Sequence, residues 1–153
     1  MNGLISFIKS IGSSRYVPSR PPVSIGITRI CVSGFTISHH TSRACQIAKE
    51  IATSNPEYET WFYFDTGSKY RKFLKIIKSE FPLEEQNKFA KHKTSPFCWL
   101  ETSEGKIAIG GRDRLCDWVN NSGKFENNYV IKKLTTTKPN ITEAFFDNTN
   151  SSN

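Results

Sequence analysis

The stretch TSPFCWLETSEGKIAIGGRD, residues 94–113, decides the fold. Its two short apolar runs, FCWLET and KIAIG, have the length and composition of strands. Between them, Ser103-Glu104-Gly105 is typical of a hairpin turn. Gly110 and Gly111 then end the second run and open a segment with apolar residues at helical spacing. The stretch therefore predicts an antiparallel hairpin followed directly by a helix.

Upstream of the hairpin, two strands alternate with two helices. Residues 25–34 predict a strand that is apolar on both faces, so we expect helices to cover both sides of it. Apolar spacing over residues 44–51 predicts a helix. Residues 59–65 predict a second strand, parallel to the first through a right-handed crossover, and residues 68–81 a second amphipathic helix. The order β-α-β-α-β-β-α predicts an α/β domain with a mixed four-stranded sheet.

We expect this domain over residues 25–121, with an arm at each end. Residues 1–24 form a basic arm whose prolines favour an extended strap, and residues 122–153 form a C-terminal extension with a polar tail. The net charge is +7 and the first acidic residue is Glu50. Such a charge favours an acidic partner. Nucleic acid is the less favoured partner because no nucleic-acid-binding motif accompanies the charge, and no apolar run is long enough for membrane insertion.

Two motifs within residues 94–113 resemble the glutaredoxin branch of the thioredoxin fold, and the resemblance covers about two thirds of the chain. It implies a cis proline at Pro96, beside which the backbone pairs with the cysteinyl part of glutathione. It also implies that Asp113, at a helix start, holds the γ-glutamyl end. The vestigial glutathione groove so implied has these residues: Thr94, Ser95, Pro96, Gly110, Gly111 and Asp113. Ordinary turn chemistry and helix capping are the alternative for each motif.

The same resemblance implies that the redox site is degenerate. Glutaredoxins have Cys-Pro-x-Cys, or Cys-Pro-x-Ser, at the start of the first helix, and this chain has Ser38-His39-His40-Thr41. Serine is a poor nucleophile at neutral pH and cannot form a disulfide. Phe35 also replaces the family's lysine, which favours the thiolate. We therefore expect no catalytic residue here, and we expect Ser38 or Thr41 to act as an N-cap.

A narrower resemblance concerns residues 93–119. This stretch is similar to the degenerate glutaredoxin-like region at the N-terminus of malate dehydrogenase 1B, a protein of ciliated and flagellated cells. The chain has no G-x-G-x-x-G motif, so dehydrogenase activity does not follow. The resemblance implies an association with cilia.

Other reactive side chains have a simpler interpretation. His39, His40 and His92 could converge as metal ligands, but no carboxylate or thiol stands beside them at ligand spacing, so we expect solvated histidines and no metal or other cofactor. Cys31 and Cys98 fall on strands that neighbour each other in this fold. They could oxidise together, but two buried core thiols are the preferred interpretation.

Basic residues complete the candidate sites. Arg71, Lys75 and Lys78 lie along one face of the helix predicted over residues 68–81. Together with Arg15 and Arg20 of the N-terminal arm, they are the candidate partner-binding residues.

Two functions remain from the sequence. The first is a non-enzymatic structural or interaction subunit of a large assembly. A ciliary axoneme, with acidic tubulin of the doublet microtubule as partner, is the expected assembly, and an accessory subunit of a mitochondrial complex is a variant, because the arm resembles a presequence. The second is a glutathione-binding sensor or weak glutathione-dependent transferase.

Overall fold

The computed structural model describes residues 18–142, and a mixed four-stranded sheet lies at its centre. The strands are β1 (Thr28–Phe35), β2 (Tyr58–Asp65), β3 (Phe97–Thr102) and β4 (Gly105–Gly110), in the order β2-β1-β3-β4. β1 runs parallel to β2, and β3 is antiparallel to both β1 and β4. The predicted α/β class, mixed sheet and hairpin are therefore confirmed.

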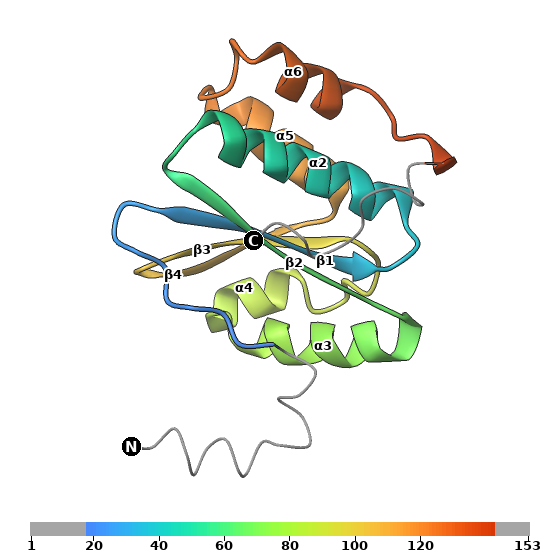
Figure 1. Cartoon of the computed structure of the whole chain (residues 1–153). Coiled ribbons are helices and arrows are strands. Elements are labelled where there is room, and N and C mark those ends of the chain that lie inside the picture. Colours follow the sequence, from blue (N-terminus) through green and yellow to red (C-terminus); the bar gives the residue numbers. More distant parts are fainter. Residues whose placement is uncertain (1–17, 143–153) are drawn as a thin grey trace.

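Helices cover both faces of the sheet (Figure 1). One face carries α2 (His39–Ser54), α5 (Arg112–Ser122) and α6 (Tyr129–Thr136), and the other carries α3 (Gly67–Ser79) and α4 (Leu83–Lys88). α2, α3 and α5 are the helices that the apolar spacing predicts. The two shorter helices, α4 and α6, are additions to the expected order.

The alternation of side chains along β1 and β3 divides the core into two layers. Ile30, Val32 and Cys98 belong to the layer beneath α2 and α5. Cys31 and Trp99 belong to the aromatic layer against α3. Burial of one large apolar side chain contributes about 1.5–3 kcal/mol, so both layers stabilise the sheet.

The start of β1 differs from the prediction. Residues 25–34 alternate like a strand, but β1 begins only at Thr28. Ile25 and Gly26 form a turn in which Gly26 has φ +85°, and Ile27 N–H donates to Ser24 O at 3.1 Å. The turn directs the preceding residues back across the domain and leaves Ile25 91% exposed.

The segment after α5 is partly helical. Asn128 caps α6 by accepting from Ile131 N–H at 2.9 Å, and α6 packs against α2 and α5. Arg43 of α2 reaches the C-terminal end of α6, where its Nη1 donates to Leu134 O at 3.1 Å and Thr137 O at 2.6 Å. The first part of the expected extension thus lies against the domain. The domain limits at 25 and 121 stay predictions.

Candidate functional site

A groove of about 450 Å³ lies where the first turns of α2 and α5 approach the loop before β3. It is lined by these residues: His40, Thr94, Ser95, Pro96, Gly111, Arg112, Asp113 and Arg114. Five of the six residues expected for a glutathione groove are thus adjacent. The sixth, Gly110, ends β4 with φ +117° beneath Phe89, whose ring would lie 3.0 Å from a Cβ placed there.

The loop before β3 is joined to the end of β1 through Ser95. The Ser95–Pro96 peptide bond is cis, as the resemblance implies. Ser95 Oγ accepts from Phe35 N–H at 2.9 Å and is hydrogen-bonded to Thr41 Oγ1. Gly34 lies directly beneath these two hydroxyls, and a Cβ there would overlap both. Glycine is therefore required at this point by close approach.

Ser38 is the N-cap of α2, as expected. Its backbone is extended, and its Oγ accepts from Thr41 N–H at 3.2 Å. This bond satisfies one of the amide groups that a helix start leaves unpaired. His39 and His40 form the first turn of α2 rather than a loop, and the centroids of their rings lie 4.2 Å apart. Thr41 is fully buried beneath them.

Arg112 connects the two helix starts across the groove. Its Nε donates to His40 Nδ1 at 3.0 Å, and its Nη2 pairs with Asp113 Oδ1 at 2.8 Å. Burial, then the neighbouring His39 and the charge of Arg112, lower the pKa of His40. A lowered pKa keeps the imidazole neutral, which it must be to accept this hydrogen bond. Arg112 is not one of the residues that the resemblance implies for the groove, and only its place beside Asp113 could have indicated it.

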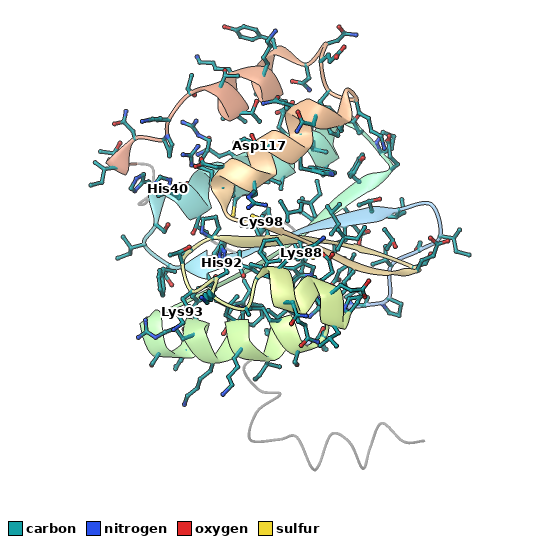
Figure 2. All side chains as sticks on the ribbon, turned by 180° about the vertical axis from the view of Figure 1, so that it is seen from behind. His40, Lys88, His92, Lys93, Cys98 and Asp117 are labelled. Atoms are coloured by element: carbon teal, nitrogen blue, oxygen red, sulfur yellow. The ribbon has the colours of Figure 1, made fainter. Side chains whose placement is uncertain are left out.

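His92, labelled in Figure 2, belongs to the loop before β3 and is hydrogen-bonded within that loop. Its Nε2 lies 3.1 Å from both Thr94 O and Pro96 O. Both partners are carbonyls, so Nε2 carries the proton and donates. Burial lowers the pKa of His92, although the two carbonyls oppose the effect. Within residues 18–142, no group of three or more His, Cys, Asp or Glu side chains could hold a metal ion.

The four cysteines do not reach the groove as reactive thiols. All four are free and buried. Cys31 and Cys98 point to opposite faces of the sheet, because the register pairs Cys31 with Trp99 and Cys98 with Val32. Burial raises the pKa of Cys31, Cys98 and Cys116. Such thiols are poor nucleophiles.

The candidate partner-binding residues separate into two kinds. Arg71 and Lys75 are exposed on α3. Lys78 instead donates to Ala90 O at 3.3 Å and His92 O at 2.8 Å, and burial followed by the charge of Lys93 lowers its pKa. It holds the loop that leads to the groove and is not a free surface cation.

Arg20, another candidate partner-binding residue, has partners within the domain. It forms ion pairs with Glu101 and Glu80, because the strap before β1 lies against the domain. Arg15 lies outside the described residues.

Comparisons with protein-family models, with curated proteins and with solved structures found no match. Any functional inference therefore depends on the residues themselves. Among the helices of residues 18–142, none has the length and apolar character needed to cross a membrane.

Proposed function

We propose that the chain contains a glutaredoxin-like domain of the thioredoxin fold that has no thiol chemistry and acts as a structural or interaction subunit. The sheet order β2-β1-β3-β4 supports the fold. Pro96 with its cis bond, and Gly110-Gly111-Arg112-Asp113 at the start of α5, support the family. The similarity to the N-terminal region of malate dehydrogenase 1B points in the same direction.

The observation that carries the proposal is the chemistry at the head of α2. In glutaredoxins a low-pKa thiol occupies this position, next to the helix N-terminus. Here Ser38 occupies it, and its hydroxyl oxygen accepts from Thr41 N–H. The chain's own thiols are buried, with raised pKa values for three of them. The proposed domain therefore has the glutaredoxin-like fold but lacks the thiol nucleophile of glutaredoxins.

An acidic protein surface is the partner that we propose. α3 has no acidic residue between Gly67 and Ser79, and its exposed side carries Arg71 and Lys75. A net charge of +7 favours association with an acidic lattice. Tubulin of an axonemal doublet microtubule is such a lattice, and we propose the cilium as the location because of the similarity to malate dehydrogenase 1B.

Co-sedimentation with tubulin polymer over a range of salt concentrations tests the partner. We expect binding that weakens with salt and with Arg71→Glu/Lys75→Glu. The matched control is Lys132→Glu/Lys133→Glu, which changes charge equally on the exposed side of α6. Equal loss in both variants would indicate general charge attraction and contradict the assignment to α3.

A cysteine placed at residue 38 tests the family. We expect the wild type to catalyse no glutathione-dependent disulfide reduction. Ser38→Cys should acquire a thiol with a pKa below the ordinary value of about 8.5, since the α2 N-terminus stabilises the thiolate. Ser79→Cys, at the end of α3, is the control without this effect. Disulfide reduction by the wild type would contradict the proposal, and so would equal pKa values in the two variants.

Glutathione binding is the second candidate, and the groove itself favours it. Pro96, Gly111 and Asp113 line one concave surface, and the Asp113 side chain is 83% exposed and available to a ligand. Titration with reduced glutathione, followed by amide NMR, tests it. Asp113→Ala should abolish saturable binding, whereas Asp117→Ala, exposed on the same helix (Figure 2), should not. Absence of binding to the folded wild type would exclude this candidate.

A further inference from the structure

The strap of residues 18–24 is held against the domain by one buried side chain. The Arg20 side chain is 10% exposed. Its neighbours are exposed: Pro18, Ser19, Pro21 and Pro22. Within residues 18–24 of the described chain, the only backbone hydrogen bond is the one that Ser24 O accepts from Ile27 N–H. Val23 is half-buried, and Arg20 is the residue of this described segment whose side chain makes ion pairs with the domain.

The anchor lies in a pocket made of two carboxylates and two indole rings. Arg20 Nε donates to both oxygens of Glu101, at 3.1 and 2.8 Å. Its Nη2 lies 2.6 Å from Glu101 Oε2 and 3.1 Å from Glu80 Oε1. The guanidinium carbon is 5.1 Å from the centroid of Trp61 and 6.0 Å from that of Trp99. The guanidinium is therefore bound both at its edge and beside aromatic rings.

The pocket is organised by residues other than Arg20. Trp99 Nε1 donates to Glu101 Oε2 at 2.9 Å, and Arg29 Nη1 donates to Glu101 Oε1 at 3.1 Å. Apart from Arg20, the cluster has two cations, Arg29 and Lys106, and the following three carboxylates: Glu59, Glu80 and Glu101. Without Arg20 it would hold one excess negative charge, and its most buried carboxylate is Glu101, whose side chain is 6% exposed. Such a site attracts a cation.

We propose that this pocket of Glu80, Glu101, Trp61 and Trp99 is a binding site for an arginine side chain in an extended segment, and that Arg20 occupies it as an exchangeable ligand. The planar fork of a guanidinium meets both oxygens of one carboxylate while its flat face lies beside aromatic rings, whereas a lysine ammonium is a point charge without this fork. The site is thus specific for arginine rather than for positive charge.

The strap has the features of a removable ligand. It leaves the domain through the turn at residues 24–27, where Gly26 has φ +85° and a Cβ would meet nothing within 4 Å. Ile25 in that turn is almost fully exposed. A groove of about 430 Å³ runs beside the strap, between Pro21–Val23 and the hairpin turn at Ser103–Gly105. An incoming segment can therefore approach the pocket alongside the strap.

The test uses the full chain with Arg20→Ala and a peptide of residues 16–24, YVPSRPPVS. NMR of the indole N–H groups is the readout: Trp61 and Trp99 line the pocket, and Trp118, which packs against Tyr58 and Phe125 in the other layer, is the internal reference. We expect saturable shifts at Trp61 and Trp99, and none at Trp118. The same peptide with lysine in place of arginine should bind at least tenfold more weakly.

Two controls keep the result unambiguous. Arg20→Ala/Glu101→Gln should lose the peptide-induced shifts, because the carboxylate that holds the guanidinium is gone. If Arg20→Ala does not fold, Arg20→Lys replaces it, and the arginine peptide must then displace the lysine. No shift, or equal binding of the arginine and lysine peptides, would overturn the proposal and leave Arg20 as an ordinary structural ion pair.

A mixing experiment identifies the source of an arginine supplied by another molecule. Labelled Arg20→Ala chain has a vacant pocket, and unlabelled Glu101→Gln chain has the strap but an impaired pocket. Shifts of Trp61 and Trp99 on mixing would assign the arginine to a second copy of this chain. If only the peptide produces the shifts, a second copy of this chain does not supply the arginine.

Discussion

Arg112 donates a hydrogen bond from Nε to Nδ1 of His40 over 3.0 Å, and this contact joins the first turn of α5 to the first turn of α2. Two helix starts, each with a positive end of its dipole, are thereby held side by side. Arg112 is positively charged, and the imidazole of His40 can accept its hydrogen bond only while the imidazole is neutral. The link therefore depends on the protonation state of His40.

Acid should weaken this link. The pKa of His40 is lowered by burial, by His39 and by Arg112, so the unfolded chain binds a proton at a higher pH than the folded chain does. The stability that neutral His40 contributes is present above about pH 6.5 and is lost as the pH falls through its lower folded pKa. NMR titration of the imidazole should give a pKa below 6.5. Arg112→Ala should raise it, and an unchanged or lower value would contradict the contact.

Gly34→Ala should destabilise the domain by about 1–3 kcal/mol, because the new methyl group overlaps the hydroxyls of Thr41 and Ser95. Gly111→Ala is the matched control. Its Cβ would meet nothing closer than 3.8 Å, so we expect only the loss of about 0.5–1 kcal/mol that alanine causes at a helix N-cap. Urea denaturation measures both. Equal effects would mean that the Ser95–Thr41 contact is not close-packed.

The fold was largely predictable because its signals are local. The dense aromatic residues of 59–65 and the helical spacing in residues 68–81 each indicate one element, and the hairpin has its own turn residues. The end of the first strand was predictable, but its start was not. Ile25 and Ile27 alternate like strand residues, yet Gly26 between them adopts a turn that the alternation cannot reveal.

The site was predictable where motifs exist and not where contacts join distant residues. Pro96 and Asp113 come from motifs, and the structure brings both to one groove. The pairing of Arg20 with Glu101 spans 81 residues and has no local signal. α6 was missed for a different reason: two lysines and two threonines make half of its eight residues polar, and its burial depends on packing against α2.

Native thiols should react slowly with Ellman's reagent at pH 8. Burial raises the pKa of Cys31, Cys98 and Cys116, so little thiolate is present. Cys116, 6% exposed against 0–1% for the others, should react first, and Cys116→Ser should remove that phase. All four should react at once in 8 M urea. A thiol other than Cys116 that reacts within seconds in the folded protein would contradict the packing.

Arg43→Ala should release α6 from α2. The Arg43 side chain donates to Leu134 O and Thr137 O at the end of the helix, and hydrogen bonds to a charged group contribute about 1.5–3 kcal/mol. Amide hydrogen exchange in α6 should accelerate, while exchange in β1 and β3 should change less. Arg114→Ala, at an exposed position of α5, is the control. Unchanged protection of α6 would mean that apolar packing alone holds it.

Glu101→Gln should destabilise the protein by about 3 kcal/mol, because it leaves the buried Arg29 and Arg20 without the carboxylate that both contact. Burial alone would raise the pKa of Glu101, but the hydrogen bonds from Arg20 and Trp99 outweigh it and hold the pKa below the ordinary 4.5. The unfolded carboxyl thus takes up its proton first, and the stability contributed by Glu101 is present above about pH 4.5 and lost as the pH falls below it.

The pH dependence separates this role from simple packing. The free energy of unfolding of the wild type should fall more steeply below about pH 4.5 than that of Glu101→Gln, because the variant has no carboxyl group at residue 101 to protonate. Glu104→Gln, exposed in the hairpin turn, is the control and should keep the wild-type slope with a change within about 0.5 kcal/mol. If Glu101→Gln keeps the wild-type slope as well, the pKa of Glu101 is the same in the folded and unfolded chains. The ion pairs with Arg20 and Arg29 would then not favour the ionised carboxylate, which contradicts the charge that we assign to the pocket.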